Sequence, residues 1–172
     1  MSMSLVDKGG GNSRLERENR NSSHMKKIVI LEDDHLLLDA LCDAFPILVS
    51  PELSVTPFLS ESAIVQALPR IAVKPPGLFI FDVMVRFDDF GRTQHPDGRF
   101  HAGLRVMRHV RAKQRLASVP IIFHSCLELA DLQRAGLERD EATGDILYIA
   151  KQTGSKVLFD EVRRLLCEHI AA

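Results

Sequence analysis

The feature that most constrains this chain is a run of apolar residues that ends in a single carboxylate. The segment Leu78–Phe81 has no polar interruption, and Asp82 follows it directly. Four bulky apolar residues preceded by Pro-Pro-Gly at 75–77 predict a strand buried on both faces, as in a parallel sheet covered by helices. Asp82 then lies at the carboxyl end of that strand, which is the edge of an open α/β sheet where ligands bind.

Similar apolar segments recur along the chain and alternate with segments of helical periodicity. The other predicted strands are 26–31, 54–58, 119–124 and 146–150. The predicted helices are 37–45, 60–68, 102–116, 127–137 and 154–170. Pro57 favours an edge position for the strand at 54–58, because proline cannot donate a hydrogen bond to a neighbouring strand. The alternation predicts an α/β fold with a doubly wound five-stranded parallel sheet.

Length, charge and cysteine content limit the class of protein. A chain of 172 residues suits one domain, and Lys+Arg 22 against Asp+Glu 23 gives no overall field that would attract nucleic acid or a membrane. Cys42, Cys126 and Cys167 are widely spaced within apolar segments, which predicts buried free thiols in a reducing compartment. No apolar run approaches the ~20 residues that cross a bilayer. We therefore expect a soluble cytoplasmic protein.

The first 24 residues differ in composition from the rest of the chain. They are polar and rich in Gly, Ser and Asn, which predicts a disordered tail. Ser23-His24-Met25 also has the form of a cloning junction, in which case Met25 is the natural start and residues 1–24 are derived from the vector. Residues 25–172 are the predicted domain.

Polar side chains follow the ends of several predicted strands. Glu32 and Asp33 follow the first strand, Ser125 follows the fourth, and Lys151 follows the fifth. All strands of a parallel sheet end at the same edge, so we expect these residues to converge with Asp82. A simpler interpretation of the acidic residues after the first strand is helix capping, which is worth about 0.3–1 kcal/mol and requires one carboxylate.

The converging groups have the chemistry of a phosphoryl site. Two carboxylates ~4 Å apart repel by roughly 4 kcal/mol at an effective dielectric near 20, so such a cluster holds a proton or recruits a cation. Carboxylate oxygens suit Mg²⁺, which commonly bridges to phosphate. Lys151 and Ser125 can donate to phosphoryl oxygens, and Asp82 can accept a phosphoryl group once positive charge offsets the repulsion.

These segments resemble the receiver domains of two-component response regulators. The resemblance covers residues 26–170 and rests on four motifs. They are Ile-Leu-Glu-Asp-Asp at 30–34, Phe-Ile-Phe-Asp-Val-Met at 79–84, Pro-Ile-Ile-Phe-His-Ser-Cys at 120–126 and Tyr-Ile-Ala-Lys at 148–151. The resemblance implies the flavodoxin-like receiver fold with strand order 2-1-3-4-5, in a stand-alone receiver similar to the chemotaxis regulators.

The resemblance also implies a phosphoacceptor and a metal site. Asp82 matches the family's phosphoacceptor, and Glu32 and Asp33 match its acidic pair. In the family the second acid binds Mg²⁺ directly and the first acts mainly through water. Met84, two residues after the phosphoacceptor, matches the position whose backbone carbonyl binds the ion.

Three further positions match, and two depart. Ser125 matches the residue that senses the phosphoryl group, Tyr148 the aromatic switch and Lys151 the invariant lysine. Arg86 and Gln152 stand where family members usually carry proline. A cis bond is common at the family's lysine-proline step but costs ~2.5–4 kcal/mol before another residue, so bond 151–152 is predicted to be trans, shifting the lysine, or strained.

The resemblance implies a signalling protein rather than an enzyme. The expected function is Mg²⁺-dependent transfer of a phosphoryl group from a histidine kinase or phosphotransfer protein to Asp82, followed by docking to a protein target. The alternative is a receiver-like interaction module that works without phosphorylation, with the unusually long loop 86–102 as its recognition element. Neither nucleic acid nor a membrane is an expected partner, and both a monomer and a homodimer remain open.

One cationic row needs a separate interpretation. Arg105, Arg108, Arg111 and Arg115 fall near one another along the predicted helix 102–116. We interpret the row as the solvated outer face of that helix rather than as a nucleic-acid contact.

Overall fold

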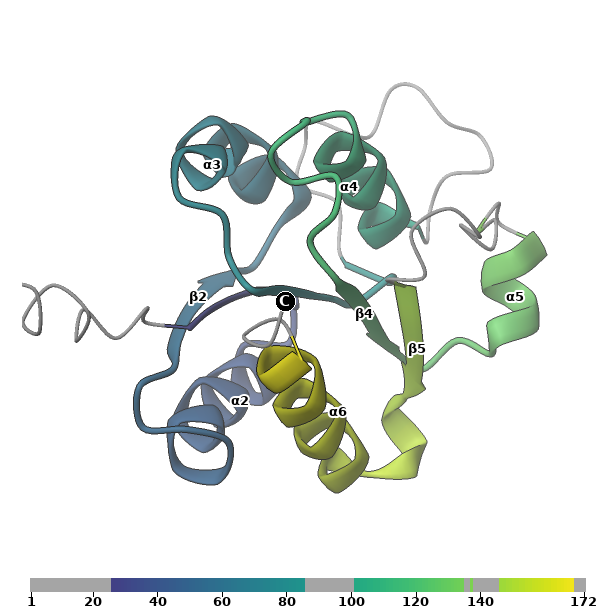
Figure 1. Cartoon of the computed structure of the whole chain (residues 1–172). Helices are drawn as coiled ribbons and strands as arrows, with labels where there is room; N and C mark the ends of the chain where they lie inside the picture. The colour runs from purple at the N-terminus through teal and green to yellow at the C-terminus, as the bar shows by residue number, and fades with distance from the viewer. Residues whose placement is uncertain (1–25, 86–100, 135–136, 138–145, 169–172) are drawn as a thin grey trace, which may run out of the picture.

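The strands form one parallel sheet, as predicted. The structure is a computed structural model, and it describes residues 26–85, 101–134, 137 and 146–168. The strands are β1 (Lys27–Leu31), β2 (Ser54–Phe58), β3 (Leu78–Phe81), β4 (Ile121–Ser125) and β5 (Ile146–Ala150). Every neighbouring pair is parallel and the order is β2-β1-β3-β4-β5, which confirms the predicted topology (Figure 1). The predicted tail 1–24 and most of the loop 86–102 lie outside the described residues.

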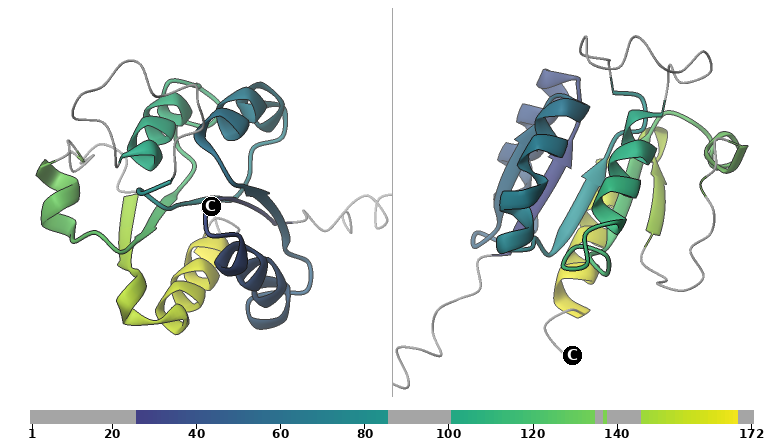
Figure 2. Two further views of the ribbon diagram at one scale, coloured as in Figure 1. Left: turned by 180° about the vertical axis from the view of Figure 1, so that it is seen from behind. Right: turned by 90° about the horizontal axis from the view of Figure 1, so that it is seen from above.

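Helices cover both faces of the sheet. They are α2 (His35–Leu48), α3 (Glu61–Val73), α4 (Ala102–Arg111), α5 (Leu129–Arg134) and α6 (Ser155–Glu168), with a 3-10 turn, η2 (Lys151–Thr153), before α6. Helices α2 and α6 lie on one face, α3 and α4 lie on the other, and α5 lies beyond β5 (Figures 1 and 2). Two apolar cores result, one on each face of the sheet.

The central strands belong to both cores because successive side chains point to opposite faces. Phe79 and Phe81 pack under α3 and α4, whereas Leu78 and Ile80 pack under α2 and α6. All four side chains of β3 are buried. The continuous apolar run that identified this strand in the sequence is therefore the consequence of burial on both faces.

Two helices extend beyond their predicted ends at residues 45 and 68, and each contains a proline. Helix α2 continues through Pro46 to Leu48, and α3 continues through Pro69 to Val73. The proline at 46 lies in the last turn of its helix, where only one internal hydrogen bond is lost and burial of Phe45 holds the turn in place. In contrast, α5 begins at Leu129, two residues after the predicted start at 127, and residues 135–136 of the predicted helix lie outside the described residues.

The three cysteines are free but not all buried. Cys42 is half-buried, while Cys126 and Cys167 are exposed. The expectation of buried thiols is wrong for the latter two because the apolar residues beside them, rather than the cysteines, point into the core. None of the helices within the described residues is long and apolar enough to span a membrane.

The arginine row of α4 is solvated only in part. Arg105 forms a bidentate pair with Glu61 of α3, with both side chains 20% exposed, and Arg111 donates to the carbonyl oxygens of Ala117 and Val119. The prediction of one solvated face is therefore wrong for these two residues, because α3 packs beside α4 and the chain turns back after it.

Candidate functional site

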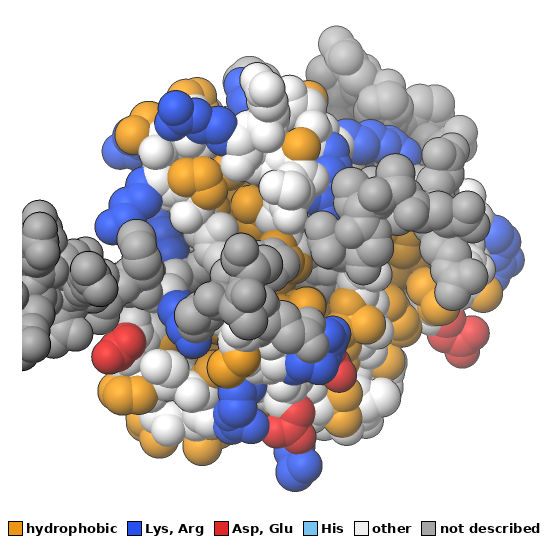
Figure 3. Space-filling model, viewed as in Figure 1, with side chains coloured by type: hydrophobic (Ala, Val, Ile, Leu, Met, Phe, Trp, Pro, Cys, Tyr) orange, Lys and Arg blue, Asp and Glu red, His pale blue; other side chains and the backbone are white. Residues whose placement is uncertain are grey.

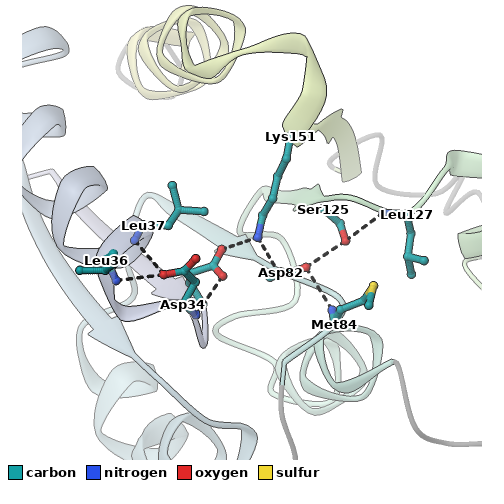
Figure 4. Close-up of polar contacts among 9 residues, drawn as sticks. Asp34, Leu36, Leu37, Asp82, Met84, Ser125, Leu127 and Lys151 are labelled. Atoms are coloured by element: carbon teal, nitrogen blue, oxygen red, sulfur yellow. Dashed lines mark hydrogen bonds and ion pairs between the residues drawn. The ribbon is translucent and has the colours of Figure 1, made fainter.

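The predicted site residues meet at the carboxyl edge of the sheet. Glu32 and Asp82 directly follow β1 and β3, Ser125 is the last residue of β4, and Lys151 directly follows β5. Figure 4 shows the side chains of Lys151, Ser125 and Asp82 pointing toward one another from three separate strands. The parallel topology alone accounts for this meeting, since every strand ends at the same edge.

Asp82 is buried and both of its carboxylate oxygens accept hydrogen bonds. The residue is only 6% exposed. Oδ1 accepts from the Ser125 hydroxyl at 2.9 Å and from the Met84 backbone N–H at 3.0 Å, while Oδ2 accepts from Lys151 Nζ at 2.7 Å. These three donors fix the orientation of the carboxylate and offset its charge.

Lys151 joins two carboxylates. Its ammonium group lies 2.8 Å from Glu32 Oε2 as well as 2.7 Å from Asp82 Oδ2. No cis peptide bond occurs within the described residues, so bond 151–152 is trans and the lysine reaches both acids nonetheless. Gln152, at the position where receiver domains usually carry proline, donates its side-chain amide to the carbonyl oxygen of Cys126 at 3.1 Å.

Burial and pairing shift the ionisation of these groups in opposite ways. Burial raises the pKa of Glu32, and nearby Asp82 adds to the rise, while the hydrogen bond from Lys151 opposes it. Burial alone would lower the pKa of Lys151, but its hydrogen bonds to Asp82 and Glu32 outweigh that effect and raise it. Lys151 thus keeps its positive charge at neutral pH.

Three carboxylates have the arrangement of a cation site. Glu32, Asp33 and Asp82 each offer an oxygen, and these oxygens lie within 4.8 Å of one another. Their hard-oxygen chemistry fits Mg²⁺, which binds through one or two carboxylates and keeps several waters. Met84 stands beside them, since its N–H bonds Asp82, and the role of its carbonyl as a ligand stays a prediction.

Glu32, Asp33 and Asp34 form an acidic triplet after β1, and Asp34 is the member that caps a helix. Its Oδ1 accepts from the backbone N–H groups of Leu36 at 3.0 Å and Leu37 at 3.2 Å, so this residue is the N-cap of α2 (Figure 4). The simpler interpretation of the triplet therefore holds for one carboxylate. The other two are left facing Asp82.

The two predicted switch residues both contact the connection between β4 and α5. The Tyr148 hydroxyl donates to the carbonyl oxygen of Leu127, and the Leu127 N–H lies 3.5 Å from Ser125 Oγ. Partial burial raises the pKa of Tyr148, and the acidic side chain of Glu128 adds to the rise. Leu127 thus links the residue that bonds Asp82 to the aromatic side chain at the edge of the sheet.

Two residues near Asp82 were not predicted as part of the site. Gly103 at the start of α4 lies so close that a Cβ atom there would overlap the Asp82 carbonyl oxygen. His124 is 4% exposed, and its Nδ1 has no hydrogen-bond partner among the described residues. Burial and the nearby charge of Lys151 lower the pKa of His124 to about 4. The sequence signal for His124 was a polar residue inside an apolar strand.

Comparison with solved structures defines the class of fold. The signal receiver domain of a two-component histidine kinase from Clostridium thermocellum aligns with TM-score 0.62 and 16% identity, covering 82% of this chain and 97% of that one. The receiver domain of a DNA-binding response regulator from Colwellia psychrerythraea 34H gives 0.60 and 17%, covering 82% and 98%. The phosphorylated form of a cyanobacterial phytochrome response regulator gives 0.56 and 18%, covering 81% and 90%.

The chain therefore has the fold of response regulator receiver domains, which confirms the expected fold class. No protein-family model matches the sequence, and no curated protein matches it either. The likeness is one of three-dimensional structure at low sequence identity, and such a fold does not by itself specify an activity.

Proposed function

We propose that this protein is a receiver of a two-component phosphorelay and that Asp82 accepts the phosphoryl group. The observation that carries the proposal is the double contact of Lys151, 2.7 Å from Asp82 and 2.8 Å from Glu32, at the edge where Ser125 also bonds Asp82. A buried carboxylate with one cation, one hydroxyl and two neighbouring acids is suited to accepting a phosphoryl group.

The transfer step uses groups that already surround Asp82. A carboxylate oxygen of Asp82 attacks the phosphorus of a phosphohistidine on a kinase or phosphotransfer protein. The new oxygen–phosphorus bond forms as the nitrogen–phosphorus bond breaks, and the imidazole nitrogen keeps the electron pair. Lys151 and Ser125, at 2.7 and 2.9 Å from the Asp82 oxygens, are positioned to donate to the phosphoryl oxygens.

A divalent ion fits the remaining charge. Glu32, Asp33 and Asp82 would hold Mg²⁺, with the Met84 carbonyl as a further ligand. When bound, the ion would supply positive charge that offsets the negative charge of the carboxylates and the phosphoryl oxygens. The pairing of Lys151 with both acids supports the need for such compensation, because three clustered carboxylates repel one another.

The proposed response runs through Ser125 and Tyr148. Once Asp82 is phosphorylated, a phosphoryl oxygen would compete with Asp82 Oδ1 for the hydrogen bond that the Ser125 hydroxyl donates. Ser125 and Tyr148 both contact Leu127, so movement of the hydroxyl would alter the connection to α5 and the surface that a protein target reads. The protein would thus act as a signalling component of the cytoplasm rather than as an enzyme with a separate substrate.

The direct test is chemical phosphorylation of the purified protein. Incubation with acetyl phosphate and Mg²⁺ should add the mass of one phosphoryl group, and chelation of the metal should prevent the addition. Asp82→Asn should abolish the adduct, while Asp39→Asn, which alters an exposed carboxylate on α2, should leave it intact. A phosphoryl adduct that persists in folded Asp82→Asn would disprove the assignment.

The same experiment distinguishes the phosphorelay receiver from the second candidate function, an interaction module that works without phosphorylation. A folded protein that forms no adduct with acetyl phosphate, and binds no beryllofluoride, would favour a receiver-like module that recognises partners without phosphorylation. The observation that favours this candidate is Gln152, which stands where receiver domains usually carry proline and whose side-chain amide donates to the carbonyl oxygen of Cys126.

A further inference from the structure

The charges of this protein are segregated although its net charge is only -1. The segment 28–69 contains no Lys or Arg, and its acids lie around β1, α2 and the start of α3. The acids are Glu32, Asp33, Asp34, Asp39, Asp43, Glu52 and Glu61. The segment 101–127, which includes α4 and β4, contains no Asp or Glu. Nearly equal totals, 22 Lys+Arg and 23 Asp+Glu, therefore conceal a separation of positive from negative charge along the chain.

The positive end of this distribution lies at the carboxyl-terminal ends of α3 and α4, which pack side by side on one face of the sheet (Figures 1 and 2). We define the basic surface as Arg70, Lys74, Arg108, Lys113 and Arg115, all of them exposed. Where grey atoms do not cover it, the part of the molecule over α3 and α4 shows Lys, Arg and apolar side chains and no Asp or Glu (Figure 3).

The basic surface differs from the cationic groups of α6 in lacking ion-pair partners. On α6, Lys156 and Arg163 both pair with Asp160, and Arg164 pairs with Glu161. The five cations of the basic surface make no ion pair with any described residue. Helix C-termini favour cations, which accounts for Arg70 and Arg108 by position but not for the lack of acids around them.

The chemistry of the surface favours a protein over a nucleic acid. Val73 is 73% exposed in the last turn of α3, with Arg70 in the same turn and Lys74 next to it, so an exposed apolar side chain lies beside two cations. Protein interfaces likewise combine apolar contacts with a polar rim. Helices α3 and α4 contain no Phe, Tyr or Trp on which a base could stack. Helix C-termini present carbonyl acceptors, whereas phosphate binding typically uses the N–H groups of helix N-termini.

We propose that the basic surface binds an acidic protein partner, through a segment rich in Asp and Glu that places an apolar side chain on Val73. Helices α3 and α4 run opposite to the strands, so their C-termini lie at the amino edge of the sheet, away from Asp82 (Figure 2). The partner therefore leaves the carboxyl edge accessible, and its binding does not depend on phosphorylation.

The test is a binding titration in which the full chain is added to a fluorescently labelled, Glu-rich helical peptide with interspersed Leu residues. Fluorescence anisotropy of the peptide measures the affinity. The triple variant Arg70→Gln/Arg108→Gln/Arg115→Gln should weaken binding by about tenfold and reduce its salt dependence. The matched control, Lys156→Gln/Arg163→Gln/Arg164→Gln on α6, removes the same charge and should leave the affinity unchanged. Equal weakening by both triples would overturn the proposal, and thermal melting checks that both variants are folded.

Further experiments distinguish an acidic protein from other molecules that could bind the basic surface. Val73→Ser should weaken binding of the peptide that contains Leu, but not binding of a peptide that has Ser in place of Leu. If Val73→Ser and the wild type bind the Leu-containing peptide with equal affinity, the apolar contact is overturned. A DNA duplex that binds more tightly than the peptide, and loses affinity in the first triple variant, would overturn the assignment to a protein. Self-association at low salt that the same variant abolishes would identify a second copy, through its acidic α2, and would also overturn it.

Discussion

Gly103 and Asp82 meet backbone to backbone: a Cβ atom on Gly103 would overlap the carbonyl oxygen of Asp82 and lie 3.0 Å from Cα of Val83. The Gly103 N–H also lies 3.3 Å from the carbonyl oxygen of Val83. The first turn of α4 is thus packed directly on the backbone that carries the proposed phosphoacceptor. Only a residue without a side chain allows this approach.

Gly103→Ala should therefore destabilise the protein by about 1–3 kcal/mol, because the obstacle is backbone and cannot rotate away. Helix propensity alone would favour Ala over Gly by ~1 kcal/mol, so a net loss reports the overlap. The control is Gly77→Ala, where the new Cβ would meet the flexible end of Leu166 at 2.9 Å. Urea unfolding measures both, and a loss no larger than that of the control would contradict the packing.

Removing the cation of Lys151 should cost about 3 kcal/mol of stability at pH 7, because Glu32 and Asp82 are left buried without a counter-charge. The folded-state pKa of Glu32 is already raised by burial and will rise further in Lys151→Met. A raised carboxylate pKa gives stability that is present at low pH and is lost as pH rises through the folded pKa. The deficit of Lys151→Met should therefore be smaller at pH 5 than at pH 7.

Denaturant unfolding at the two pH values checks this prediction. Lys156→Met is the matched control, since it removes the cation of an exposed pair on α6 and should leave stability nearly unchanged at both. A deficit in Lys151→Met that is constant with pH would show that Glu32 does not take up the proton.

His124 should make the protein less stable in mild acid. The pKa of His124 is about 4 in the folded protein, whereas the usual value for histidine, which applies to the unfolded chain, is 6.5. Between these two pH values the unfolded chain therefore binds more protons than the folded protein. Stability then falls as pH drops through that window, by about 2 kcal/mol between pH 7 and pH 5. His124→Leu should lack this component, whereas His109→Gln, at an exposed position on α4, should keep it. Identical pH profiles for wild type and His124→Leu would refute the shift.

Tyr148 is the single tyrosine of the chain, so its ionisation can be followed directly by absorbance. Partial burial, followed by the charges of Glu128, Cys126 and Asp131, should move the titration midpoint above the usual value of about 10. Glu128→Gln should lower the midpoint of the folded protein, and Glu161→Gln on α6 should not. A folded midpoint equal to that measured in urea would contradict the environment described for this residue.

The sequence by itself determined the class of fold and the edge at which the site lies. Strands buried on both faces require long apolar runs, and alternation with helices requires parallel strands, so both features are local patterns that survive in one dimension. The position of Asp82 after one such run, and of Ser125 and Lys151 after two others, followed from the same topology. The order of the strands came from the family resemblance rather than from any pattern.

Tertiary structure alone decided which individual groups touch. Whether Arg105 faces solvent or Glu61, whether Cys126 is buried, and whether Gly103 can approach Asp82 depend on how helices pack against each other and against loops. Those contacts join residues far apart in sequence and vary with rotations of a helix by a fraction of a turn, which periodicity does not fix. The segregation of charge was present in the sequence, but only the packing of α3 beside α4 makes it one surface.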